Sequence, residues 1–232
     1  MEVLEKQQNT ESKVNNLDHY TIAMKDADIY QKEYLVLNKV NLKIYPGEFI
    51  FLIGKTGSGK SSLLKTIYGA IPLQKGEATV AGYELRSIRR KQLPLMRRKL
   101  GMIFQDFLLL EDRSVYDNLE FVLKATGWKD KNEINRRIIQ SLQEVGMKYQ
   151  AHKMPHQLSG GEKQRLAISR ALLNSPELII ADEATGNLDP DTSMEILQLI
   201  VNLQKSHNTA VLFGKIFTDS RLTAALVDRL IH

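Results

Sequence analysis

The sequence of 232 residues contains no cysteine. Disulfide bonds, thiolate zinc sites, iron–sulfur clusters and cysteine nucleophiles are therefore excluded. The sequence also lacks a long apolar run: the longest, 49–54, has about six residues, whereas a membrane-spanning helix needs about 20. The first 18 residues have neither a basic start nor an apolar stretch, so we expect no secretory signal there and a cytoplasmic protein.

Neither sign of charge dominates, because the sequence has 32 basic and 27 acidic side chains and a net charge of +5. The basic residues nevertheless gather in one segment, 86–99 (RSIRRKQLPLMRRK), which holds seven of them and no acid. A solvated face is the simplest interpretation of such a run. Contact with anionic lipid headgroups, or with an acidic face of a membrane partner, is the alternative.

The composition, 43% hydrophobic and 25% charged, is that of a globular protein and excludes a disordered or fibrous chain. Apolar and polar residues alternate over 40–44, which predicts a half-buried strand, and 48–53 predicts a strand buried on both faces. Strands alternate with helices at both ends of the chain, and a more helical segment lies between them, which indicates an α/β domain with a helical insert. The other predicted strands are 76–82, 100–105, 178–181 and 209–213, and the predicted helices are 60–68, 132–145, 161–174 and 191–204.

A glycine-rich segment, GKTGSGKS at 54–61, follows the second of these strands and opens a helix. It matches the phosphate-binding pattern G-x-x-x-x-G-K-[ST], in which backbone N–H groups approach a polyphosphate. In this pattern Lys60 reaches the β- and γ-phosphates and the Ser61 hydroxyl faces Mg²⁺. A merely flexible loop is the alternative, and the strand–loop–helix context argues against it.

Two carboxylates, Asp182 and Glu183, follow the apolar strand 178–181. Neighbouring side chains at a strand end point to different faces. Asp182 can therefore address the metal while Glu183 polarises a water for attack on the γ-phosphate. A solvated acidic turn would be the alternative if the phosphate loop were absent.

A third motif, LSGGEKQR at 158–165, opens a helix between the phosphate loop and the acidic pair, with Ser159 as its cap. The order and spacing of the three motifs closely resemble those of the ATP-binding-cassette (ABC) ATPases, over roughly residues 20–213. Within that family the chain resembles most the ATPases of bacterial cell division, which pair with a membrane protein. ATPases of lipoprotein and macrolide exporters share much of the pattern and are the alternative.

The resemblance implies a role for each matching position. An aromatic residue stacks on adenine at the position of Tyr30, Gln105 matches the glutamine after the segment 101–104, and 186–189 (GNLD) matches the D-loop. The residues expected to contact ATP are Tyr30, Gly54, Lys55, Thr56, Gly57, Ser58, Gly59, Lys60, Ser61, Ser62 and Gln105. Those expected at Mg²⁺ are Ser61, Gln105 and Asp182, and the expected catalytic base is Glu183. The residues expected to contact the ATP of a partner subunit are Ser159, Gly160, Gly161 and Gln164, beside the D-loop Asp189.

The resemblance also implies an architecture and partners. It predicts a P-loop NTPase with a mostly parallel core sheet, an antiparallel β subdomain and a helical insert at about 106–165, within a domain 19–232 that follows a flexible tail 1–18. It predicts a head-to-tail homodimer that sandwiches ATP and Mg²⁺. An integral membrane protein would hold this dimer at the cytoplasmic face of the plasma membrane, with no role for nucleic acid.

The chain departs from the family pattern near its end. Aligning 209–212 with the last family strand puts Ile216 where the family has a histidine, and Ala184 replaces a proline. Isoleucine neither donates a hydrogen bond nor carries charge. Our hypothesis is that the end, from about 213, is divergent or the product of a shifted reading frame, so that nucleotide binding persists and hydrolysis is slow. A nucleotide-dependent clamp with little hydrolysis is therefore an alternative to an ATPase.

A DNA-repair or chromosome-structure ATPase is a further alternative, since those proteins also carry a Ser-Gly-Gly motif. They need a long coiled-coil insert, whereas only the 97 residues 62–158 separate Ser61 from Ser159, without sustained heptads. Because this segment is so short, a DNA-repair or chromosome-structure ATPase is the weakest of the alternatives.

Overall fold

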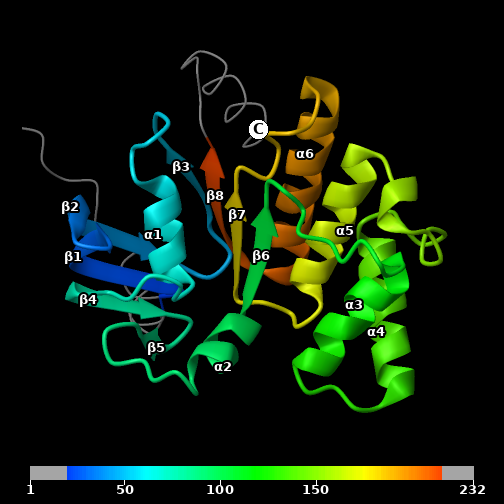
Figure 1. The fold of residues 1–232 in the computed structure, drawn as a ribbon, viewed down its shortest axis with the longest axis horizontal. Helices are drawn as coiled ribbons and strands as arrows, with labels where there is room; N and C mark the ends of the chain where they lie inside the picture. The colour runs from blue at the N-terminus through cyan, green and yellow to red at the C-terminus, as the bar shows by residue number, and fades with distance from the viewer. Residues whose placement is uncertain (1–19, 216–232) are drawn as a thin grey trace, which may run out of the picture.

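The computed structural model describes residues 20–215 (Figure 1). The expected tail 1–18 and Ile216 lie outside the described residues. Within that described part, no helix combines the length and the hydropathy needed to cross a membrane.

Two four-stranded sheets form the framework. One is antiparallel, with the order β2-β1-β4-β5, and the other is parallel, with the order β3-β8-β7-β6. The parallel core sheet and the separate antiparallel sheet confirm the predicted fold class. Their bounds are β1 Ile22–Gln31, β2 Tyr34–Ile44, β4 Lys75–Val80 and β5 Tyr83–Glu84, and β3 Phe49–Ile53, β8 Ala210–Lys215, β7 Leu178–Asp182 and β6 Leu100–Phe104.

The helices cover the two faces of the parallel sheet. In Figure 1, α1 lies between the two sheets, whereas α5 and α6 pack on the opposite face of the parallel sheet and α3 and α4 lie beyond α5. Each face has its own buried apolar cluster, one around Leu64 and Ile180 and the other around Leu166 and Phe213. The helices are α1 Lys60–Ile67, α2 Leu93–Arg98, α3 Val115–Ala125, α4 Lys131–Glu144, α5 Gly160–Leu172 and α6 Pro190–His207, with a 3₁₀ turn at Pro155–Gln157.

The predicted helices are confirmed by their buried stripes and caps. Ile134, Ile138 and Leu142 of α4 are almost fully buried. The Asp189 carboxylate accepts the backbone N–H of Thr192 at 2.9 Å and begins α6, as an N-cap aspartate does. This helix continues to His207, three residues beyond its predicted end at 204.

The prediction of a strand buried on both faces at 48–53 is wrong. The side chains of β3 are half-buried and Ile53 is 51% exposed. Among the described strands β3 is at the edge of the parallel sheet and pairs only with β8, so one side lacks a neighbour. Phe49 and Phe51 pack against the buried Phe213, with ring centroids 6.3 and 5.8 Å away. Ile50 and Leu52 pack against the other apolar cluster, so both faces of β3 contact the core, and its place at the sheet edge keeps these contacts from burying it fully.

Candidate functional site

The phosphate loop connects the end of β3 to the start of α1. Gly59 caps α1 in a left-handed conformation, with φ = 90°. A Cβ at this position would lie 2.8 Å from Val36 Cγ1 and 2.9 Å from Leu37 Cγ. Glycine is therefore required here both for its backbone conformation and for the close approach of β2.

Lys60 is held inside this loop. Its Nζ donates to the carbonyl oxygens of Gly54 at 2.7 Å and Lys55 at 2.9 Å, and to Ser58 Oγ at 3.3 Å. The residue is only 7% exposed. All three acceptors are uncharged, so an anion beside this ammonium would replace neutral hydrogen bonds by stronger charge-assisted ones.

The loop surrounds a hollow of about 260 Å³. Its wall consists of loop residues, the first turns of α1, Gln31 and Val36 from the β1–β2 hairpin, and Glu183. Tyr30, the expected adenine-stacking residue, is half-buried on β1 beside Leu35, with Lys75 Nζ 5.9 Å from its ring centroid, and does not line this hollow. Gln31 and Val36 were not predicted at the site, and nothing in the sequence except their closeness to Tyr30 indicates them.

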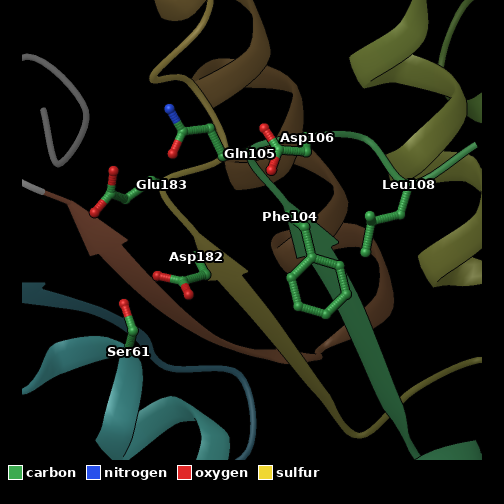
Figure 2. Close-up of a pocket in the computed structure, with 7 residues that line it drawn as sticks. All are labelled: Ser61, Phe104, Gln105, Asp106, Leu108, Asp182 and Glu183. Carbon is green, nitrogen blue, oxygen red and sulfur yellow. The ribbon is translucent and has the colours of Figure 1, made fainter.

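The two carboxylates stand where β7 ends. Asp182 is the last residue of β7, and it shares the wall of one hollow with Ser61. Burial raises the pKa of Asp182, opposed by Lys65, Ser61 and Lys60. Figure 2 shows Ser61, Asp182 and Glu183 around one hollow of about 210 Å³, together with Gln105. A hydroxyl, a carboxylate and an amide oxygen are the ligand types that Mg²⁺ prefers, so this donor set fits that ion.

Glu183 has an unusual backbone conformation. Its φ is 52°, in the left-handed region, and such conformations are costly for a residue with a side chain. Two hydrogen bonds hold it: its N–H donates to the Gly214 carbonyl at 2.9 Å, and its carbonyl accepts from the Gly186 N–H at 2.8 Å. The turn places the Glu183 side chain on the walls of both the phosphate-loop hollow and the Asp182 hollow.

Gln105 is tied to the segment after the carboxylates. Its Nε2 donates to Asn187 Oδ1 at 2.9 Å, and Asn187 Nδ2 donates back to the Gln105 carbonyl at 3.2 Å. A Cβ on Gly186 would lie 2.9 Å from Gln105 Nε2, so glycine permits the close approach. Asn187 was not among the predicted site residues, although its place between Gly186 and Asp189 in the D-loop pattern could have indicated it.

The third motif forms the start of α5. Ser159 Oγ accepts the Glu162 N–H at 3.2 Å, and a Glu162 carboxylate oxygen accepts the Ser159 N–H at 2.9 Å, which is a capping box. The pKa of Glu162 is lowered, mainly because its carboxylate accepts the Ser159 N–H. Lys153 lowers this pKa further, and burial opposes the shift. Ser159 and Gly160 are exposed at a helix N-terminus, where the helix dipole favours an anion.

A hollow of about 400 Å³ adjoins this helix start and includes Gly161, Asn187 and Asp189 in its wall. Gln164 is different: it is fully buried, and neither polar atom of its amide has a hydrogen-bond partner among the described residues. The structure therefore brings Ser159, Gly160, Gly161 and Asp189 together at the surface and places Gln164 in the interior.

The Ser159 hollow and the phosphate-loop hollow share no lining residue. The helix starts that form them lie on opposite sides of the parallel sheet (Figure 1). Two helix starts suited to an anion that do not face each other on one chain are the arrangement expected if each is completed by a second copy.

Replacing Asp182 by asparagine is expected to raise the thermal midpoint of the ligand-free protein by a few degrees at neutral pH. Burial raises the pKa of the Asp182 carboxyl in the folded state, so its ionised form opposes folding. The gain should be full above the folded pKa and should vanish as pH falls below the unfolded value of about 3.9. Thermal melts of both proteins between neutral pH and about pH 3 measure it. A gap that persists at the lowest pH would have another cause.

Comparisons with known proteins agree with this geometry. Residues 37–186 match the family model described as ABC transporter. The chain is 42% identical over 177 residues to the cell division ATP-binding protein FtsE of Streptococcus pneumoniae, covering 75% of this chain and 76% of that protein. It is 41% identical to the methionine import ATP-binding protein MetN of Clostridioides difficile, covering 79% of this chain and 57% of MetN.

A solved structure is also similar. The ATP-binding cassette MJ0796, in a dimeric post-hydrolysis state bound to ADP and Pi, superposes with a TM-score of 0.73 at 31% identity, over 87% of this chain and 89% of that one. With the family model matched over more than half of its length, the chain belongs to the ABC transporter family of ATP-binding cassettes.

Proposed function

We propose that the protein binds and hydrolyses ATP as a head-to-tail dimer and thereby drives an integral membrane partner. The observation that carries this proposal is the convergence of Lys60, Ser61, Asp182 and Glu183 on adjoining hollows. Fold and motif order alone would support only nucleotide binding, whereas the acidic pair beside the phosphate loop supports hydrolysis.

The residues divide the chemistry among them. The loop N–H groups and Lys60 would hold the triphosphate, and Ser61 and Asp182 would hold Mg²⁺, with Gln105 near them. The metal ion, when bound, neutralises charge that develops on the phosphate oxygens. Glu183, fixed by its left-handed turn, would orient a water and take its proton.

A second copy would complete each site. The exposed Ser159 and Gly160 N–H groups offer a γ-phosphate a second helix N-terminus, and the dimeric MJ0796 cassette supports this arrangement. Because Asn187 lies in the wall of the Ser159 hollow and bonds Gln105, the partner's site is connected to this chain's own Gln105. Nucleotide would then favour the closed dimer by the difference in its affinity for closed and open states.

A groove of about 380 Å³ between α2, β6, α3 and α5 is the surface we assign to the membrane partner. Met102, Phe104, Leu108 and Val122 give it an apolar floor. Phe104 and Leu108 also line the hollow below Gln105, so a helix seated here would contact the same residues as the nucleotide site. Arg170 of α5 donates to the carbonyls of Phe107 and Leu108 and ties the groove to the helix that Ser159 caps.

We propose a cell-division role in which the partner is an FtsX-type membrane protein, because FtsE proteins are among the relatives and match most of both chains. The cassette would then be a peripheral protein of the cytoplasmic face of the plasma membrane. The MetN relatives support an alternative, the ATPase subunit of an ABC transporter. The ATPase subunit of a lipoprotein or macrolide exporter is a further alternative. A clamp with little hydrolysis is the alternative suggested by Ile216.

Single-turnover hydrolysis of ATP by the full chain, with and without an FtsX-type partner in nanodiscs, tests the proposal. We expect the partner to accelerate hydrolysis about tenfold or more, since docking at the groove would order Gln105 and the catalytic carboxylates. Val122→Gln in the groove should lose most of the acceleration, whereas Ile139→Gln, an exposed apolar residue of α4 outside the groove, should keep it. ATP that binds but is not hydrolysed with the partner present would favour the clamp.

A further inference from the structure

A run of unpaired positive charge extends from the end of β5 through α2. Two of the seven basic side chains in 86–99 have partners: Arg97 donates to the carbonyls of Tyr68 and Gly69 at 3.1 and 3.0 Å, and Lys99 pairs with Glu177 at 2.9 Å. The other five are exposed and have no ion-pair partner in the described part of the chain; they are Arg86, Arg89, Arg90, Lys91 and Arg98. We call 86–98 the basic loop.

An apolar side chain projects from the same loop. Leu95, in the first turn of α2, is 55% exposed, whereas its neighbour Met96 is fully buried. Met96 therefore fixes the turn to the core while Leu95 faces outward. Hydrogen bonds between Arg89 and Gln92, one from each backbone N–H, also fix the approach to α2. The cations and the leucine are thus presented by a preformed surface.

The position of the loop points toward a membrane. Figure 1 shows β5 and α2 together at the lower edge of the molecule. Pro94, Arg97 and Arg98 also line the groove assigned above to the membrane partner, so the loop adjoins the side that such a partner would occupy. This step rests on the proposed function; the charge and exposure of the loop do not.

We propose that the basic loop binds the anionic headgroups of a phospholipid bilayer, with Leu95 entering the interface. Clustered cations around an exposed apolar side chain are the features by which a peripheral protein recognises an anionic bilayer. Arg86, Arg89, Arg90 and Lys91 line none of the four hollows described above, so no recess beside them would fix the position of a single acidic peptide. The spread of charge over an open surface favours lipid.

Flotation of the purified full chain with vesicles tests this proposal. Vesicles of phosphatidylcholine alone are compared with vesicles in which a third of the lipid is phosphatidylglycerol, without nucleotide or partner. We expect binding to the anionic vesicles only, weakening with salt. Because each cation near such a surface strengthens binding about fivefold, Arg89→Gln, Arg90→Gln and Lys91→Gln together should weaken it about a hundredfold.

A matched triple variant separates this surface from net charge. Lys25→Gln, Lys39→Gln and Lys148→Gln remove the same charge from exposed lysines on β1, β2 and the segment after α4, and should weaken binding only a fewfold. Equal losses in the two triples, or equal binding to both kinds of vesicle, would overturn the proposal. Because the assay contains neither partner nor ATP, its failure would leave the proposed ATPase function standing.

Discussion

Replacing Glu183 by glutamine is expected to lower the rate of ATP hydrolysis about 10²- to 10⁴-fold, the usual contribution of a positioned general base. Glutamine keeps the size of the side chain and the left-handed turn, whose two hydrogen bonds come from the backbone. It cannot accept the proton of the attacking water. ATP affinity should therefore change little, because Lys60 and the loop N–H groups remain.

The same variant should accumulate as an ATP-bound dimer. If two copies join through ATP and separate after hydrolysis, blocking hydrolysis removes the step that releases them. Size-exclusion chromatography with light scattering, at saturating ATP and Mg²⁺, measures this population beside the single-turnover rate. The wild-type protein should be mainly monomeric once its ATP is consumed.

A control for the Glu183 variant is Glu111→Gln, which makes the same chemical change at an exposed carboxylate of the β6–α3 connection. It should hydrolyse ATP at the wild-type rate. A Glu183→Gln protein that stays monomeric under saturating ATP would contradict the shared site, and one that hydrolyses ATP normally would remove Glu183 from the mechanism.

The sequence predicted which residues lie together better than it predicted the packing around them. The juxtaposition of the phosphate loop with Asp182 and Glu183 could be predicted because each motif follows an apolar strand, and the strand ends of a parallel sheet meet at one edge. Ser159 was found because a helix cap has its own local signature. These inferences needed only short-range patterns and the order of the motifs.

Long-range packing could not be predicted in this way. The first strand, β1, was not predicted, because register shifts between Met24 and Ala27 and between Ala27 and Tyr30 break the alternation that would reveal it. The short helix α2 was not predicted, because only Met96 of this helix is buried and its sequence therefore has no apolar stripe. The partial exposure of β3 depends on its place at the sheet edge, which nothing in its own sequence specifies.

The hydrogen bonds between Gln105 and Asn187 also depend on long-range packing and could not be predicted. The two residues are 82 positions apart, and each belongs to a different motif. The likeness to a family located both motifs, but the hydrogen bonds between them depend on how β6 and β7 lie beside each other. Gln164 shows the opposite case, since its motif suggested an exposed role while the packing of α5 buries it.

Replacing Lys60 by alanine is expected to weaken ATP binding about 10²- to 10⁴-fold, because two or more hydrogen bonds between charged groups are lost at once. Lys60 has no ion-pair partner in the described structure and only uncharged acceptors. Its ammonium is therefore available to the phosphates at the cost of weaker bonds within the loop. Titration calorimetry with ATP measures the loss directly.

Folding should survive the Lys60 substitution. Its acceptors line or adjoin the hollow, where water can replace the ammonium, and the apolar side chains that anchor α1 (Leu63, Leu64 and Ile67) are untouched. Thermal melting without nucleotide should therefore give nearly the wild-type midpoint, while the stabilisation that ATP confers on the wild type should disappear.

Lys65→Ala provides the matched control, since Lys65 lies one turn further along α1, lines the same hollow and is exposed. An ion pair made by an exposed lysine contributes about 1 kcal/mol or less, so the loss of Lys65 should weaken ATP binding less than tenfold. Equal losses in the two variants would mean that ATP senses only the positive potential of α1. Unchanged affinity in Lys60→Ala would show that the glycine loop is not where the triphosphate binds, and the assignments of Ser61, Asp182 and Glu183 would fail with it.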